Sequence, residues 1–418
     1  MPLGDNSDHE IKGVSKTNVR LETGEVVDSF GRVQTETGLF HLKVSDEGEI
    51  TEIIDASDRK PDCSGFNAKQ KLALPAFKDL HNHLDKTYLS LEWKASRPSK
   101  SLEHRLEMEV TELTELAKTT EQRAQMMIER HLKNGVNHIR THVNIDPFIR
   151  LENLKAVKKA LDKYQDYLTY EIVAFPQHGL LRHPEVPDLL RQALQSGATM
   201  LGALDPGGID KDIEASLQLT MAIAKEYNSD VDFHLHDSGH LGYYTMDHWL
   251  RMVEQEGYKG RTSFSHAFGL SGIGENRQRA FAKRLKEHDV QIMTTVPINL
   301  QRNLIPIDIL TEAGVFVGMG CDGFYDSWSP NVSGDMLERV TEFCDYTGKT
   351  TERKLRESLA YITQGMTPLD QNATYQWPKV GDEASFVLLN ASCSAEAVAR
   401  APQAQERTLI NKGKIYNR

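Results

Sequence analysis

The central part of the chain repeats one pattern, a short apolar run followed by a segment with helical periodicity. The apolar runs are rich in β-branched residues and cover residues 72–81, 136–143, 170–176, 198–205, 231–237, 262–268, 290–296 and 315–322. Segments between them, such as LENLKAVKKALDKYQDYL, carry apolar residues at a spacing of three to four, as amphipathic helices do. Strands and helices that alternate eight times predict an α/β protein with a (β/α)8 TIM barrel. An open doubly wound sheet is the alternative, because periodicity does not show whether a sheet closes.

The two ends of the chain depart from this pattern. From residue 19 to about residue 71, short β-rich pieces alternate with turn residues, and residues 373–418 return to the same style. We therefore predict that both ends build one small β-sandwich-like domain. Its N-terminal part would be residues 1–72 and its C-terminal part residues 371–418, on either side of a barrel of residues 73–370.

The composition indicates a globular protein that acts on small molecules. The chain has 418 residues, of which 39% are hydrophobic, and a formal net charge of -11 with no Lys/Arg stripe. Nucleic acid and acidic membrane surfaces are therefore not expected as partners. The polar start, MPLGDNSDHEIKG, lacks the apolar core of a signal peptide, and no run approaches the roughly 18 apolar residues of a membrane helix. We expect a cytoplasmic protein.

The cysteines restrict the kind of metal site that the chain can build. Cys63, Cys321, Cys344 and Cys393 are scattered and form no C-x-x-C motif. This spacing argues against a disulfide scaffold and against a thiolate zinc site. A metal ion would therefore be held by histidine and carboxylate side chains.

Side chains that can bind a metal or a substrate stand where the predicted strands end. The first run continues into DLHNHLDKT, where two histidines are one residue apart and would share a strand face. In a barrel the carboxyl ends of all strands meet at one rim. The residues concerned are His81 and His83 after the first run, Gln177 after the third, His234 and Asp237 at the fifth, His266 at the sixth and Asp322 at the eighth.

Three histidines and one aspartate at this rim would suit Zn²⁺ or Fe²⁺ and leave one position for a water. A divalent ion lowers the pKa of a bound water toward neutrality, which makes it a nucleophile. A single histidine at a strand end more often packs in the core, and the H-x-H pair alone is balanced between packing and binding. Ligand-type residues at four strand ends together favour the metal site.

Four nearby residues leave alternatives open. His236 shares a strand face with His234 and is therefore a rival for its role as a ligand. His142 either lines the same rim or packs in the core. Asp85 and Lys86 form either a solvated charge pair or, in the case of Lys86, a contact with the site.

The segment GMGCDG (318–323) matches the dinucleotide-binding pattern G-x-G-x-x-G. That motif must open a helix whose N-terminus receives the pyrophosphate, whereas the turn-forming FYDSWSPN follows here. We therefore predict no dinucleotide. H-E-x-x-H is absent, as is the H-x-E and P-C-x-x-C pair of the zinc deaminases that act on cytidine.

Six segments in this order resemble the amidohydrolase superfamily, in particular the branch of bacterial cytosine deaminase and N-isopropylammelide isopropylamidohydrolase. They are HNHLDKT, HIRTHVNID, EIVAFPQHG, VDFHLHDSG, GYKGRTSFSHAF and GCDGFYDSW, and they span most of the chain. VDFHLHDSG, YKGRTSFSHAF and the preceding LGALDP are more similar to the isopropylammelide enzyme.

The resemblance implies one divalent ion, Zn²⁺ or Fe²⁺, because ATMLGALDP lacks the carboxylated lysine of the binuclear relatives. It also implies a homo-oligomer, a place for His266 beside the bound water, and a substrate ring contacted by Gln177 and Trp328. Lys86 is a further candidate for a substrate contact. The implied metal ligands are His81, His83, His234 and Asp322.

Two positions depart from cytosine deaminase. Asp237 stands where that enzyme has its glutamate proton shuttle, and Gly323 replaces an acidic residue that contacts its substrate, so cytosine itself is not favoured. We expect hydrolytic removal of an amino or alkylamino group from a pyrimidine- or triazine-like ring. Asp322 would accept the water proton, His266 would stabilise developing charge, and Asp237 would relay a proton. Hydrolysis of a cyclic amide and a catalytically silent metal- or ligand-binding barrel are the alternatives.

Overall fold

The computed structural model describes residues 15–58, 65–296, 304–331, 333–404 and 406–416. The expectations drawn from the N-terminal segment 1–14 and from Cys63 lie outside the described residues. Among the residues that are described, no helix is both long enough and apolar enough to cross a membrane.

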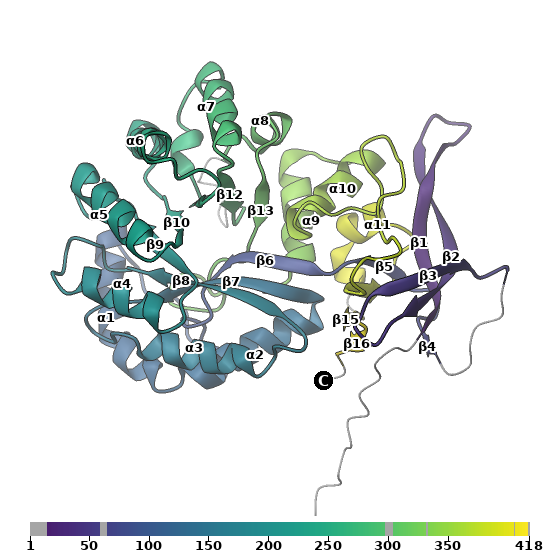
Figure 1. Cartoon of the computed structure of the whole chain (residues 1–418), viewed down its shortest axis with the longest axis horizontal. Coiled ribbons are helices and arrows are strands. Elements are labelled where there is room, and N and C mark those ends of the chain that lie inside the picture. Colours follow the sequence, from purple (N-terminus) through teal and green to yellow (C-terminus); the bar gives the residue numbers. More distant parts are fainter. Residues whose placement is uncertain (1–14, 59–64, 297–303, 332, 405, 417–418) are drawn as a thin grey trace, which may run out of the picture.

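A parallel eight-stranded sheet with helices around it forms the larger part of the molecule (Figure 1). Its strand order follows the sequence from β6 to β13. The two outermost strands are joined by a parallel bridge between Asn82 and Asp322 and by the hydrogen bond from Asp322 N to His81 O (2.8 Å). The predicted (β/α)8 barrel is thereby confirmed. Its strands are β6 (Phe77–Asn82), β7 (Val136–Asn144), β8 (Thr169–Phe175), β9 (Met200–Leu204), β10 (Asp230–His234), β11 (Thr262–Ser265), β12 (Gln291–Thr294) and β13 (Val317–Met319).

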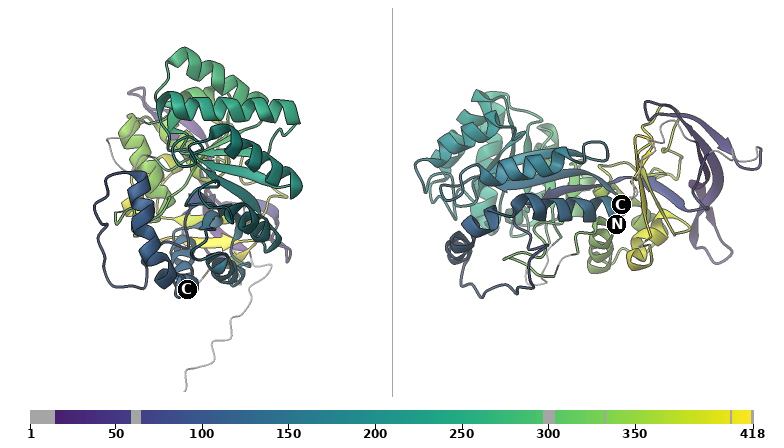
Figure 2. Two further views of the ribbon diagram at one scale, coloured as in Figure 1. Left: turned by 90° about the vertical axis from the view of Figure 1, so that its left-hand side faces the viewer. Right: turned by 90° about the horizontal axis from the view of Figure 1, so that it is seen from below.

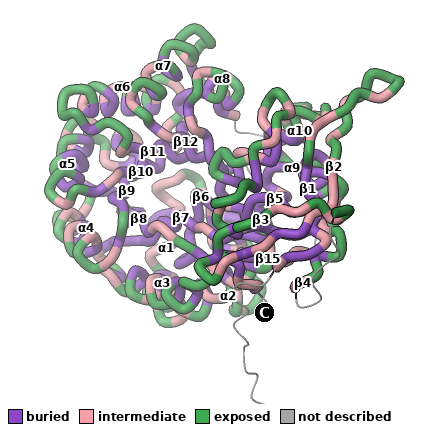
Figure 3. Tube along the Cα trace, turned by 45° about the vertical axis from the view of Figure 1, so that its right-hand side comes forward, coloured by how far each residue is buried: buried purple, intermediate pink, exposed green. Residues whose placement is uncertain are grey.

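The helices cover the outside of the barrel with one apolar face each. In α4, for example, Val186, Leu189, Leu190 and Ala193 are buried, at the spacing of three to four that one helix face requires. Figure 3 shows buried strands in the interior and exposed outer helix turns. The helices around the barrel are α1 (Leu102–Ala117), α2 (Thr120–Lys133), α3 (Glu152–Asp162), α4 (Val186–Gln195), α5 (Ile213–Glu226), α6 (Gly239–Glu256), η1 (Phe268–Leu270), α7 (Glu275–Glu287), α8 (Ile307–Glu312), α9 (Met336–Thr347), α10 (Glu352–Ser358) and η2 (Leu359–Ile362).

A second sheet combines strands from both ends of the chain, as predicted (Figure 2). Its strand order is β16-β15-β14-β5-β1-β2-β3, and β4 pairs with β1. A separate apolar cluster, which includes Val19, Leu42 and Phe386, packs inside it. The elements of this part are β1 (Lys16–Val27), β2 (Val33–Val44), β3 (Ile50–Asp55), β4 (Phe66–Asn67), β5 (Leu72–Pro75), β14 (Phe386–Leu389), α11 (Ser394–Ala399), η3 (Ala401–Gln403), β15 (Thr408–Asn411) and β16 (Lys414–Ile415).

The first predicted strand, residues 72–81, is in fact two strands that belong to different sheets. β5 pairs with β14 and β1 in the second sheet, whereas β6 pairs with β7 in the barrel. The chain crosses between the sheets at Ala76. Both strands are almost wholly buried, which is why the sequence shows one uninterrupted apolar run.

Candidate metal centre and active site

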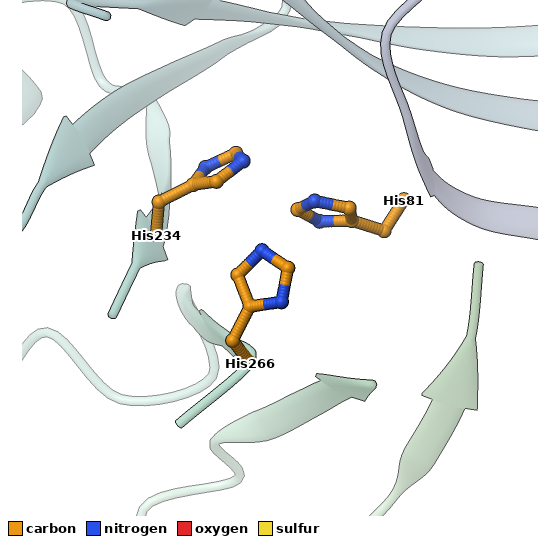
Figure 4. Close-up of side chains that lie close together, drawn as sticks. All are labelled: His81, His234 and His266. Carbon is orange, nitrogen blue, oxygen red and sulfur yellow. The ribbon is translucent and has the colours of Figure 1, made fainter. Parts of the chain in front are cut away.

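Five predicted side chains converge at the carboxyl ends of the barrel strands. His81 lies on β6 and His83 directly follows it, His234 ends β10, and His266 and Asp322 follow β11 and β13. Oδ1 of Asp322 lies 3.3 Å from Nε2 of His83 and 3.7 Å from Nε2 of His81. Oδ2 of Asp322 lies 3.9 Å from Nε2 of His266, and Nε2 of His234 lies 3.3 Å from Nε2 of His83. Figure 4 shows His81, His234 and His266 around one common space.

The backbone conformation at two of these residues is strained. The φ angles of His266 and Asp322 are 64° and 62°, in the left-handed region that residues other than glycine seldom adopt, at a cost of about 1–3 kcal/mol each. Hydrogen bonds from His266 N to Met293 O and from Asp322 N to His81 O, both 2.8 Å, hold them there. Neighbouring strands of the barrel therefore stabilise the conformation in which both side chains reach the site.

The hydrogen bonds of two histidines determine which ring nitrogen is free to bind a cation. Nδ1 of His83 lies 3.1 Å from the carbonyl oxygen of His142, which can only accept, so Nδ1 carries the proton. Nδ1 of His81 lies 2.8 Å from Oγ of Ser265, which donates to the Asp232 carboxylate at 2.6 Å, so this Nδ1 is also the donor. Nε2 of each ring therefore presents a lone pair to Asp322.

These lone pairs face a carboxylate, an arrangement that a positive charge between them would stabilise. Burial lowers the pKa of His83 to about 3 and holds the pKa of His234 well below its ordinary value, so both rings are neutral at neutral pH. Neutral imidazoles with one carboxylate form a donor set that fits a divalent transition metal ion.

Asp79 fixes the junction between the first and last barrel strands, next to the predicted metal ligands His81 and Asp322. Its Oδ1 accepts hydrogen bonds from the backbone N–H groups of His81 (3.2 Å) and Cys321 (3.1 Å). Its Oδ2 lies 2.6 Å from Nε2 of His131. Asp79 is fully buried, and its contacts therefore set the spacing between His81 and Asp322.

We expect Ser265→Ala to weaken metal binding about 10–100-fold, because second-layer partners that orient a metal-bound histidine contribute on this scale. The change removes the acceptor for Nδ1 of His81 and breaks its link to Asp232. Competition with a chromogenic chelator would measure the affinity. Ser263→Ala is the matched control on the same strand, because Oγ of Ser263 bonds Arg140 instead of a histidine. Equal affinities of the two variants would contradict the orienting role of Ser265.

A cavity of about 480 Å³ lies over the histidines and is large enough for a small heterocycle. It contains all the predicted catalytic and substrate-binding residues and four of the five convergent side chains. Its lining includes His83, Lys86, Phe175, Gln177, His234, His236, Asp237, His266, Asp322, Asp326 and Trp328.

One wall of the cavity is a network around Lys86. Nζ of Lys86 donates to Oε1 of Gln177 at 2.6 Å, so the amide group of Gln177 is oriented. Nε2 of Gln177 donates to Glu109 (3.3 Å), a residue of α1 that also accepts from Nε1 of Trp328 (3.4 Å). The ammonium group also lies 5.3 Å from the ring centroid of Phe175. This wall therefore offers a cation, an amide and aromatic faces to a bound ring.

The carboxylate of Asp205 holds the segment after β10 in place and affects the pKa of Asp237. Asp205 is buried, and its Oδ1 accepts from the backbone N–H groups of His236 (2.6 Å) and Asp237 (3.0 Å). Its Oδ2 lies 2.8 Å from Nδ1 of His236. Burial and the charge of Asp205 raise the pKa of Asp237 to about 6. A Cβ at Gly208 would lie 2.3 Å from Oδ1 of Asp237, so any side chain at position 208 would have to displace this carboxylate.

The structure places each of the residues for which the sequence left alternatives open. His236 bonds Asp205 and lines the cavity. His142 is buried, with its ring centroid 4.3 Å from that of His81, and it is not among the residues that line the cavity. Asp85 and Lys86 are both buried, so the solvated charge pair is wrong, and Lys86 reaches the cavity. After β13 the next helix begins at Met336, so GMGCDG opens no helix.

Four residues that shape the site were not predicted from the sequence. They are Glu109, Phe175, Asp205 and Asp326. Asp205 ends the run 198–205, so the rule applied to the other strands would have found it. Glu109 lies on a helix whose position over the site follows from tertiary packing, and no local pattern indicates it.

The model of the amidohydrolase family matches residues 65–415. The uncharacterized protein YahJ of Escherichia coli is 37% identical over 388 residues, which are 92% of this chain and 83% of that protein. The N-isopropylammelide isopropyl amidohydrolase of a Pseudomonas species is 28% identical over 361 residues, 84% of this chain and 87% of that protein.

The chain is also similar to a solved structure, that of N-isopropylammelide isopropylaminohydrolase from Burkholderia multivorans. The TM-score is 0.83 at 28% identity, and the match covers 97% of this chain and 98% of that chain. The similarity therefore includes the barrel and the second sheet.

Proposed function

The chain belongs to the amidohydrolase family, and from this premise we propose that it is a metal-dependent hydrolase of nitrogen heterocycles. The proposed reaction is the hydrolytic removal of an amino or alkylamino group from a pyrimidine- or triazine-like ring. The single observation that carries the proposal is the convergence of histidine lone pairs on Asp322 at the floor of a cavity of about 480 Å³.

His81, His83, His234 and Asp322 would hold one divalent ion, Zn²⁺ or Fe²⁺. When bound, this ion supplies Lewis acidity and lowers the pKa of a coordinated water. Every other group that the reaction needs belongs to the chain. Asp322 accepts a proton from the attacking water, because its carboxylate lies among the histidines and lines the cavity. His266 lines the cavity beside Asp322 and stabilises charge that develops on the ring.

Asp237 supplies the proton that the ring or the leaving nitrogen needs. Its pKa of about 6 leaves part of the population protonated near neutral pH, which suits a group that both takes up and releases a proton. Aspartate is one methylene shorter than the glutamate that cytosine deaminase has at this position. Gly208 has no side chain, so its backbone approaches Asp237 closely, and its N–H donates to Oδ2 of Asp237 at 2.8 Å.

The cavity wall formed by Lys86, Gln177 and Glu109 would bind the ring and exclude water from the face of the ring that it covers. Gln177 is held by Lys86 and Glu109, so its amide offers a fixed hydrogen-bonding pattern to ring atoms. Two relatives that cover most of the chain are named for N-isopropylammelide, an alkylamino triazine, and this supports a triazine or a closely related ring.

The test is a panel of ring compounds with the Zn²⁺- or Fe²⁺-loaded protein. N-isopropylammelide, cytosine and hydantoin represent alkylamine removal, ammonia removal and cyclic amide opening. Release of isopropylamine or ammonia above a metal-free control would support the proposal. Opening of hydantoin without amine release would replace it by cyclic amide hydrolysis.

We expect kcat/KM to decrease as pH rises through about 6, because Asp237 must carry the proton that it donates and its pKa is about 6. Asp237→Asn should abolish this decrease, which forms the alkaline limb of the pH–rate profile. It should also lower turnover about 10²–10⁴-fold, the range for a general acid. The measurement is a pH–rate profile from about pH 5 to 9.

Asp237→Glu is the control for this experiment and should keep the limb, because it retains a carboxyl group. A limb that persists unchanged in Asp237→Asn would show that another group supplies the proton.

A further inference from the structure

The two carboxylate oxygens of Asp326 differ, because Oδ1 accepts hydrogen bonds from the backbone whereas Oδ2 has no partner among the described residues. Oδ1 accepts the backbone N–H groups of Trp328 (2.8 Å) and Ser329 (2.9 Å). Oδ2 is buried and has no hydrogen-bond partner among the described residues. An unsatisfied buried acceptor is unfavourable, so an oxygen left in this state on a residue that lines a cavity indicates a ligand.

The position of Oδ2 relates it to the active site. Asp326 lies in the loop after β13, four residues beyond Asp322, and it lines the same cavity as Asp322 and His266. The two bonds to Oδ1 fix the orientation of the carboxylate, because rotation would break both. Oδ2 is thereby held against Gly323, at the position that a Cβ of residue 323 would occupy.

Gly323 is what makes this arrangement possible. A Cβ on Gly323 would lie 1.9 Å from Oδ2 of Asp326 and 3.0 Å from its Cγ. Any side chain at position 323 would therefore displace the carboxylate. The glycine leaves Oδ2 next to the backbone that carries the metal ligand Asp322.

We propose that Oδ2 of Asp326 recognises the substrate by accepting a hydrogen bond from an N–H group of the bound heterocycle. The inference rests on the proposed function and extends it, because it names the donor that the substrate must present on the side of Asp322. Rings with a ring N–H or an amino group at this edge fit the site, and rings that are N-alkylated there do not.

The electrostatic surroundings of Asp326 are consistent with a hydrogen-bond donor to Oδ2 that the protein itself does not supply. Burial raises the pKa of Asp326 to about 7, against the lowering effect of its backbone hydrogen bonds. Lys86 lowers this pKa and Asp322 raises it. An N–H group of the substrate would donate to Oδ2 and so stabilise the ionised carboxylate.

Asp326→Asn tests the proposal with almost no change of shape. Its carbonyl oxygen can keep both backbone hydrogen bonds, and this fixes the NH₂ group at the place of Oδ2. The variant would then turn a donor toward the N–H of the substrate. We expect the Kd of N-isopropylammelide, measured calorimetrically with metal-loaded protein, to rise at least tenfold, with unchanged metal content and Tm.

A second ligand isolates the hydrogen bond from other effects. The wild type should bind ring-N-methylated N-isopropylammelide at least tenfold more weakly than the parent compound, whereas Asp326→Asn should hardly distinguish the two. Gly323→Ala should also lose the discrimination, because its Cβ displaces Oδ2. Equal discrimination in the wild type and Asp326→Asn, or no binding of either compound to the wild type, would overturn the assignment.

The outcomes for the reaction and for this contact can be separated. If the wild type binds N-isopropylammelide but no compound of the panel releases isopropylamine or ammonia, the proposed reaction is wrong while the binding comparison still tests Asp326. If isopropylamine is released equally well by the wild type and Asp326→Asn, with the same KM, the reaction stands and the contact is wrong.

Discussion

Replacement of Asp322 by asparagine is expected to abolish measurable turnover and to remove most of the bound metal. The variant keeps the size of the side chain but removes the negative charge that lies 3.3–3.9 Å from Nε2 of His83, His81 and His266. It also removes the base that accepts the proton of the attacking water. Loss of a catalytic base alone costs about 10²–10⁴-fold, and loss of the metal adds to this, so we expect a decrease of at least about 10⁴-fold.

The measurements are metal content by elemental analysis and amine release from the best substrate of the panel. Asp345→Asn, a substitution of an exposed aspartate on α9, controls for the loss of one negative charge and should leave both quantities unchanged. Full metal content in Asp322→Asn would show that the histidines alone hold the ion. Turnover within tenfold of the wild type would remove Asp322 from the mechanism.

The sequence predicts the barrel because a parallel sheet leaves a strong periodic signal. Each of the eight apolar runs overlaps one barrel strand, which extends at most one residue beyond the run, and a strand that is covered on both faces needs apolar residues at nearly every position. The same property hides the crossing between the two sheets at Ala76, because β5 and β6 are equally buried. Local hydrophobicity reports burial, but it does not report which sheet a strand joins.

The convergence of the site also follows from the sequence, because the carboxyl ends of barrel strands share one rim. The residues that orient the site do not follow from it. Ser265 and Asp232 act through a relay across neighbouring strands, and Asp79 acts across the junction of the barrel. Their roles depend on strand register at the level of single hydrogen bonds, and no sequence pattern specifies that register.

Replacement of His266 by alanine is expected to lower turnover about 10²–10⁴-fold while the metal stays bound. His81, His83, His234 and Asp322 remain in place in this variant, so the donor set that we assign to the ion is intact. The loss falls on kcat more than on KM, because the imidazole interacts with charge that develops only in the transition state. His266 is placed for this role because it lines the cavity beside Asp322.

Elemental analysis and steady-state kinetics on the same preparation test this expectation. His248→Ala is the matched control, since His248 lies on α6 and its Nε2 contacts only the carboxylate of Glu214 among the ion pairs of the described residues. Metal loss in His266→Ala as large as in Asp322→Asn would make His266 a ligand. Near-normal turnover with metal retained would instead assign the charge stabilisation to another group, and His236 is the next donor that faces the same cavity.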